Sequence, residues 1–196
     1  MITLVLMKDK KGSKMKNNSV KIVVATGIGA ALFVIIGWLI NIPTPVPNTS
    51  IQLQYAVLAL FSALFGPLAG FLIGFIGHAL KDSFLYGSPW WTWVLGSGLS
   101  GLFFAFAVKR NQLVQGIFGG KEIVRFNLVQ LVTNVVVWGV IAPIGDILVY
   151  NEPANKVFTQ GVVAGLANAV TVAVAGTLLL KLYAATRTKS GSLDKE

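Results

Sequence analysis

The chain has 196 residues, of which 55% are hydrophobic and only 12% are charged, and its mean hydropathy is +0.73. Because a soluble domain carries about 25% charged residues, this composition is typical of an integral membrane protein. The sequence has no cysteine and one histidine, which excludes disulfides and argues against a zinc or haem centre.

Basic residues gather on alternate connections between the apolar segments. Cytoplasmic connections of membrane proteins carry the Lys and Arg excess. The pattern therefore predicts that both termini lie in the cytoplasm, and it accounts for the net charge of +9 without a nucleic-acid partner. Only Lys81 and Lys156 fall on outer connections. The other fourteen basic residues are Lys8, Lys10, Lys11, Lys14, Lys16, Lys21, Lys109, Arg110, Lys121, Arg125, Lys181, Arg187, Lys189 and Lys195.

The first apolar segment runs from Val20 to Ile40. As a helix it rises about 31 Å, enough to cross the hydrocarbon core, and it exceeds the roughly 7–15 residues of a signal-peptide core. We therefore predict a retained span that follows a cytoplasmic extension over residues 1–19. Met15 also fits as a start, which would make residues 1–14 a polar upstream extension.

An uncharged, proline-rich connection follows the first span. It reads NIPTPVPNTS, from Asn41 to Ser50. Three prolines in five residues oppose both a helix and ladder pairing, so we predict an extended outer loop. It is either a simple linker or a lid over an outward-facing pocket.

The remaining spans are predicted from breakers and charges. Gly66-Pro67 divides the next apolar stretch into two helices, because proline favours the first turn of a helix. A single kinked span is the alternative, and it would place the middle basic connection outside. The complete prediction is an all-α bundle of six transmembrane helices over residues 20–185, with a cytoplasmic tail over residues 186–196. Its later spans are residues 51–65, 67–85, 90–108, 123–148 and 157–183.

Small residues recur at helix-packing spacing in three spans. In lipid they mark close helix contacts. Two such groups are GSGLSG, from Gly96 to Gly101, and the pair Gly161 and Gly165. These residues either pack the protein's own helices or, on the first helix, dock a separate membrane subunit. The candidates for such a partner interface are Ala25, Gly27, Gly29 and Ala31.

Polar side chains inside the spans carry the functional signal, because they are costly in a bilayer. In the fifth span, Asn127, Gln130, Asn134 and Trp138 share one helical face. They either bond neighbouring helices or face a pocket. Towards the outer end the sequence places His78, Lys81, Asp82, Asp146 and Gln160, with Asn168 deeper.

Aromatic residues crowd the second outer connection, from Lys81 to Trp93. They either form an interfacial belt or stack on a flat ring. Together with the amides and the histidine, they suit an uncharged or weakly charged heteroaromatic ligand. The candidate binding residues are His78, Lys81, Asp82, Trp91, Asn134, Trp138, Asp146 and Asn168.

Enzyme signatures are absent from the sequence. Residues 116–121 read GIFGGK and lack the spacing of a phosphate-binding loop, and no catalytic triad is suggested by spacing. We expect neither catalysis nor ATP hydrolysis by this chain, and no metal or cofactor of its own. A non-transporting membrane scaffold and a lipid-acting membrane enzyme remain as alternatives.

One long string resembles the S components of energy-coupling factor (ECF) vitamin transporters. It reads FGPLAGFLIGFIGHALKD, from Phe65 to Asp82, and GSPWWTWVLGSGLSG follows it. The string is similar to a subgroup of riboflavin-type or hydroxymethylpyrimidine-type S components. The motif ATGIGAALF on the first helix, the uncharged outer loop and the basic cytoplasmic ends agree with the same family.

The resemblance implies a subunit of the bacterial plasma membrane that binds a scarce vitamin from outside. It also implies three partners: a transmembrane coupling subunit and two cytoplasmic ATPases, which alone use ATP. Ala25 and Gly29 match the family's Ala-xxx-Ala docking surface, with Gly27 and Ala31 as a second pair. We expect hydroxymethylpyrimidine or pyridoxine as the ligand, with riboflavin as the alternative.

Overall fold

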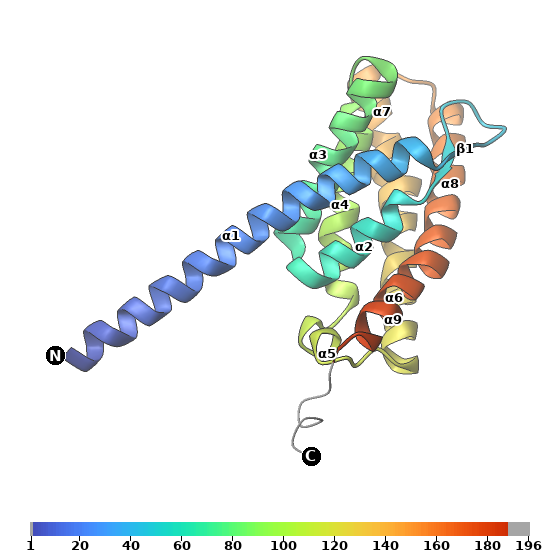
Figure 1. Cartoon of the computed structure of the whole chain (residues 1–196). Coiled ribbons are helices and arrows are strands. Elements are labelled where there is room, and N and C mark those ends of the chain that lie inside the picture. Colours follow the sequence, from blue (N-terminus) through green and yellow to red (C-terminus); the bar gives the residue numbers. More distant parts are fainter. Residues whose placement is uncertain (1, 188–196) are drawn as a thin grey trace.

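The computed structural model describes residues 2–187, with side chains from residue 19 onward, and this part of the chain is almost entirely helical (Figure 1). Four helical stretches are long and apolar enough to cross a membrane, and two shorter apolar helices accompany them. The prediction of an all-α membrane protein is confirmed, while the side on which the termini lie stays a prediction. The four long stretches are Ser19–Leu39, Pro67–Tyr86, Gly120–Tyr150 and Ala154–Ala185.

The first helix, α1 (Ile2–Leu39), is continuous. No break in the helix separates the predicted extension from the predicted span. Figure 1 shows α1 crossing the bundle towards the hairpin that follows it, with its N-terminal part extending away from the other helices. The C-terminal residues of the predicted tail lie outside the described part of the chain.

The proline-rich connection forms a short hairpin, so the prediction that it has no ladder pairing is wrong. Strands β1 (Asn41–Pro43) and β2 (Ser50–Gln52) pair antiparallel. Two of its three prolines fall in the turn, and Pro43 occupies only the end of its strand, where its missing N–H disrupts the ladder least. The Thr44 amide donates to the Thr49 carbonyl oxygen at 3.0 Å, and the two threonine hydroxyls are also hydrogen-bonded.

The break at Gly66 gives two helices, as predicted, in place of one kinked span. Helix α2 (Gln54–Phe65) ends at Gly66, and α3 (Pro67–Tyr86) begins with its proline in the first turn. Gly66 has a φ of 94°, in the region that favours glycine. The chain turns back there, and α3 returns towards the hairpin end of the bundle.

The last two predicted spans are each one continuous helix with a π-helical interior. Pro143 lies near the first of these π segments, where a proline would otherwise clash with the preceding turn of an α-helix. The remaining elements are α4 (Trp91–Ala107), α5 (Arg110–Val114), α6 (Gly120–Val136), the π segment η1 (Val137–Ile141), α7 (Ala142–Tyr150), α8 (Ala154–Thr171), the π segment η2 (Val172–Gly176) and α9 (Thr177–Ala185).

Helices α3 and α4 approach each other through bare backbone. A methyl group added at Gly70 would overlap the carbonyl oxygen of Gly101, and one added at Gly101 would overlap that of Gly70. At Gly74 the added group would meet the carbonyl oxygen of Ser97. The GSGLSG motif therefore packs the protein's own helices.

The small residues of α1 divide between two faces. Ala25 and Gly29 are buried within the protein, and Gly29 lies against Ile73 of α3. Gly27 and Ala31 are exposed, and nothing lies within 4 Å of a methyl group built on Gly27. Only the second pair is open to a partner in this structure.

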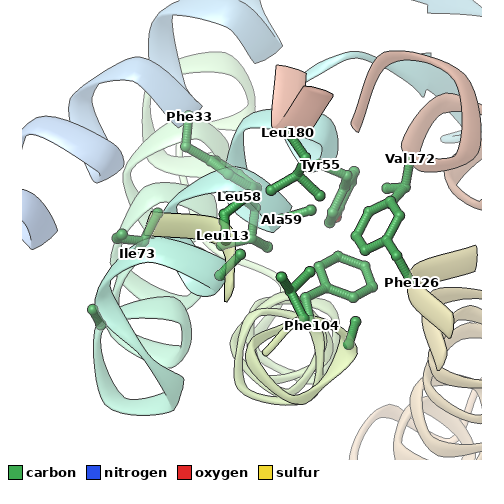
Figure 2. Packing of buried hydrophobic residues seen from close by; sticks show 14 of the residues in the cluster. Phe33, Tyr55, Leu58, Ala59, Ile73, Phe104, Leu113, Phe126, Val172 and Leu180 are labelled. Atoms are coloured by element: carbon green, nitrogen blue, oxygen red, sulfur yellow. The ribbon is translucent and has the colours of Figure 1, made fainter. Parts of the chain in front are cut away.

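The apolar core lies between the short and the long helices (Figure 2). Figure 2 shows Leu58, Phe104, Phe126 and Leu180 pointing into one shared interior from α2, α4, α6 and α9. Each of these side chains is fully buried.

We expect Gly101→Ala to lower the unfolding free energy by about 1–3 kcal/mol, because its methyl group overpacks the α3–α4 contact. Gly27→Ala is the matched control, since its methyl group enters open space. Detergent-solubilised protein unfolded with increasing SDS measures both variants. An equal loss of stability in the two would contradict the proposed close approach.

Candidate ligand-binding site

A cavity of about 360 Å³ opens at the hairpin end of the bundle. The hairpin, the start of α2, the end of α3, the start of α4, α7 and most of the length of α8 surround it. Its lining is polar and aromatic, with two apolar residues. The lining residues are Asn48, Thr49, Ser50, Gln52, Tyr55, His78, Lys81, Asp82, Tyr86, Ser88, Trp90, Trp93, Asp146, Glu152, Lys156, Val157, Gln160, Ala164 and Asn168.

A chain of hydrogen bonds forms the inner wall of the cavity. The Tyr55 and Ser97 hydroxyls are 2.9 Å apart, and the Ser97 hydroxyl lies 2.5 Å from His78 Nδ1. On its other side, His78 Nε2 lies 3.3 Å from Asp82 Oδ1. Every group is satisfied if Tyr55 donates to Ser97, Ser97 donates to Nδ1, and Nε2–H donates to Asp82. A neutral His78 completes this network.

Lys81 adds a buried charge to the same wall. Its Nζ lies 3.4 Å from Asp82 Oδ1, and both side chains are almost fully buried. The backbone N–H of Trp90 donates to the other Asp82 oxygen at 3.2 Å. Charges at membrane depth need such partners, so Lys81 and Asp82 form a neutral pair that faces the cavity.

Asp146 holds the aromatic wall in place. Its Oδ1 accepts a hydrogen bond from Trp90 Nε1 at 2.7 Å, and its Oδ2 accepts one from Trp93 Nε1 at 2.8 Å. The Thr92 hydroxyl also donates to Oδ1. With three donors on one carboxylate, Asp146 fixes two indole rings and has little capacity left for a ligand.

The hairpin forms one wall of the cavity and is attached to α8. Gln160 Nε2 donates to the Pro47 carbonyl oxygen at 2.8 Å. Asn48 and Thr49, the next residues in the turn, line the cavity. This geometry favours the lid over the simple linker, because the hairpin lines the site and is bonded to α8.

Asn168 lies deeper in the cavity, on α8. Its side chain is 3% exposed and makes no hydrogen bond with another residue in the described part of the chain. Leaving a buried amide without a partner costs free energy. The Asn168 amide is therefore available to donate to, and accept from, a ligand.

Five of the eight predicted binding residues line the cavity, and three do not. The five are His78, Lys81, Asp82, Asp146 and Asn168. Trp91 is exposed and packs on Phe75, with ring centroids 6.1 Å apart. Trp138 is fully buried behind the aromatic wall, against Tyr55 and Trp93. Neither residue reaches the cavity.

Asn134 belongs to a polar network between helices. Its Nδ2 lies 3.0 Å from Gln130 Oε1, and Gln130 Nε2 donates to the Ala169 carbonyl oxygen of α8 at 3.2 Å. Asn127 Nδ2 donates to the Thr177 hydroxyl of α9 at 3.1 Å. Of the two uses that the sequence left open for this face, the structure shows interhelical bonding.

The sequence-based candidates missed several lining residues. Tyr55 of α2 was missed because the sequence does not show that it lies against Ser97 of α4. Trp90 and Trp93 were part of the aromatic connection, but the helix phase that separates them from Trp91 depends on where α4 begins. Lys156 and Glu152, joined by an ion pair at 2.6 Å, were not among the candidates.

Asp146→Asn should leave at least one indole N–H without an acceptor. We expect the unfolding free energy to fall by about 1.5–3 kcal/mol, as for other hydrogen bonds to a charged group, and the tryptophan emission to shift to the red. Glu152→Gln is the matched control at the rim, where an exposed pair contributes about 0–1 kcal/mol. Equal effects in the two variants would contradict the conclusion that Asp146 holds the two indole rings in place.

Comparison with known proteins places the chain in a family. The family model described as "ECF-type riboflavin transporter, S component" matches residues 17–185. A UPF0397 protein of Lactococcus lactis subsp. cremoris SK11 is 87% identical over 186 residues, which cover 95% of this chain and 99% of the relative. A UPF0397 protein of Streptococcus gordonii is 66% identical over 178 residues, covering 91% of this chain and 95% of the relative. No solved structure matches.

The sequence left open two alternative functions, a membrane scaffold and a lipid-acting enzyme. The family match favours a transporter subunit over both. It agrees with the apolar spans, and it fits a site made of binding groups near one end of the bundle. The chain is a multi-pass membrane protein with bacterial relatives. It belongs to the family of S components of ECF-type riboflavin transporters, which are binding subunits and not enzymes.

Proposed function

We propose that this S component captures riboflavin from outside the cell for import. The observation that carries the proposal is the cavity of about 360 Å³ with aromatic and polar walls. The family model that matches this chain is described as that of a riboflavin transporter S component. The sequence alone favoured a single-ring vitamin precursor. Cavity size and family both support the larger ligand.

Size separates the two kinds of ligand. Pockets for drug-sized molecules have volumes of about 300–1,000 Å³ and bury most of the ligand surface. The cavity lies within this range. The three fused rings and polyhydroxyl chain of riboflavin would use its aromatic wall and its polar rim, whereas hydroxymethylpyrimidine or pyridoxine would leave much of it filled with water.

Charge favours an uncharged vitamin over its phosphorylated forms. Lys81 is paired with Asp82, and Lys156 with Glu152. Asp146 then leaves the ionisable lining with more acidic than basic groups, taking His78 as neutral. An anionic phosphate would enter this low-dielectric site without a free cation, which is costly.

Individual residues can be given roles in this scheme. Trp93 and Tyr55 would contact the flat ring. Asn168, whose amide is free, would bond the ring edge, as would the Lys81 ammonium group. Asn48 and Gln52 of the hairpin would bond hydroxyl groups near the rim.

The scheme sets an orientation and partners. The cavity would open to the outside, and both termini would lie in the cytoplasm of a bacterial plasma membrane. A transmembrane coupling subunit and two ATPases would supply the energy, so the S component would need no cofactor. On α1, the exposed Gly27 and Ala31 would meet the coupling subunit, because Ala25 and Gly29 are covered by the protein itself.

A binding panel with purified protein in detergent tests the ligand. We expect saturable binding of riboflavin without ATP, seen as quenching of its fluorescence, and much weaker binding of flavin mononucleotide. Trp93→Leu should reduce the affinity for riboflavin at least about tenfold, given the roughly 0.5–1.5 kcal/mol of a ring contact in addition to the buried area. Trp38→Leu is the control, since Trp38 is exposed and lies outside the cavity lining.

The panel also includes hydroxymethylpyrimidine and pyridoxine. If either compound binds more tightly than riboflavin, that compound is the ligand and the proposal of riboflavin is wrong. The family assignment would not change. Equal binding of riboflavin and flavin mononucleotide would contradict the charge argument.

Gln160→Leu tests the hairpin as a lid. Loss of the bond to the Pro47 carbonyl oxygen should raise the ligand dissociation rate about two- to tenfold, as expected for a hydrogen bond of about 0.5–1.5 kcal/mol. Stopped-flow fluorescence measures the rate. Thr159→Val is the neighbouring control, because the Thr159 hydroxyl bonds only within α8. An unchanged rate in Gln160→Leu would mean that the attachment does not hold the hairpin closed.

A further inference from the structure

A second cavity lies at the end of the bundle opposite the ligand site. It has a volume of about 290 Å³ and opens between the end of α4 and the start of α6. Helices α5 and α9 end at the same side of the molecule (Figure 1). Its polar lining consists of Lys109, Gln112, Lys121, Glu122 and Arg125.

The three basic residues in this cavity lack acidic partners. In the described part of the chain, none of them forms an ion pair. The only carboxylate of the lining, that of Glu122, accepts a hydrogen bond from the Gly119 N–H at 3.0 Å and caps the start of α6. Arg125 Nη2 donates to the Phe106 carbonyl oxygen at 3.0 Å, which leaves most of its guanidinium N–H groups free.

Exposed apolar side chains lie next to the lining residues on α4 and α6. Phe106 of α4 is 55% exposed, and Val124 and Leu128 of α6 are each 59% exposed. The bond from Arg125 to Phe106 joins the two helices at this point. A cationic hollow is thus bordered by an apolar surface, the arrangement that matches a phosphate group with attached hydrocarbon chains.

We propose that this cavity binds the headgroup phosphate of an anionic phospholipid, with the acyl chains along the exposed residues of α4 and α6. Basic hollows between membrane helices are suited to such headgroups on the cytoplasmic side. The site is distinct from the ligand cavity and does not depend on which vitamin is bound.

Not all basic residues at this end of the bundle line the cavity. Arg110 and Lys181 are exposed bases at the same end, but neither lines the cavity. They provide a matched control, because replacing both removes the same charge as replacing Lys121 and Arg125.

Native mass spectrometry of the delipidated full chain, titrated with phosphatidylglycerol or phosphatidylcholine, tests the proposal. The parent protein should prefer phosphatidylglycerol. Because each basic residue contributes about 1 kcal/mol near an anionic headgroup, the double variant Lys121→Gln/Arg125→Gln should lose about tenfold or more of that preference. Arg110→Gln/Lys181→Gln should change it by less than about threefold.

Three results would overturn the proposal. The first is an equal loss in both double variants, which would indicate only general surface charge. The second is no preference for phosphatidylglycerol in the parent protein. The third is full displacement of the lipid by millimolar glycerol 3-phosphate, which would identify a free phosphate compound as the ligand.

A third variant, outside the transmembrane helices, tests the site if the double variant does not fold. Lys109 lies on the connection between α4 and α5, so Lys109→Gln should fold even where the double variant fails. It should weaken phosphatidylglycerol binding about fivefold, and binding equal to that of the parent protein would count against the site.

Discussion

The close approach of α3 to α4 is the constraint on which the site depends. At Gly70, Gly74 and Gly101 the two backbones meet without side chains between them. In a bilayer, where lipid is as apolar as any side chain, such packing is a main source of helix association. It also brings Ser97 of α4 within reach of His78 of α3 and Tyr55 of α2. Larger residues at these positions would separate the helices and break the polar network at its middle member.

Polar side chains in the bundle fall into two groups by their surroundings. Gln130 and Asn134 of α6 bond each other and neighbouring backbone. Lys81 and Asn168 line the cavity and keep donors or acceptors available there. The first group supports the structure and the second is available for recognition. Because Gln130 bonds the carbonyl oxygen of Ala169, next to Asn168, the same residue types serve different purposes at one depth, according to the face on which they lie.

Much of the architecture could be predicted from the sequence, because membrane crossing imposes simple rules. Length and hydropathy predicted the apolar spans, and Gly66-Pro67 predicted the break between α2 and α3. The clustering of His78, Lys81 and Asp82 near Asp146 followed from their predicted position at the same end of the bundle. These features depend on local chemistry and on distance along the helix axis, both of which a sequence contains.

Rotation about the helix axis was harder to predict. Trp91 was chosen over Trp90 and Trp93, although the structure turns only the latter two towards the cavity. The hairpin was missed because its pairing depends on the threonines that close its turn. The π segments were missed because hydropathy and helix breakers do not reveal an extra residue within a helical turn. Tyr55 could be located only once α2 was placed against α4.

The segment η1 determines what the outer part of its helix presents. In an uninterrupted α-helix, Asp146 would lie about 120° around the axis from Asn134. One additional residue in the wide turn reduces this angle to about 20°, which brings the carboxylate onto the face that the tryptophans share. If η1 were a regular α-helical turn with the same number of residues, the part of the helix beyond it would be rotated by about 100°, and Gly145 would take that face instead. The register of one irregular turn, more than the identity of any side chain, therefore decides whether this wall of the cavity exists.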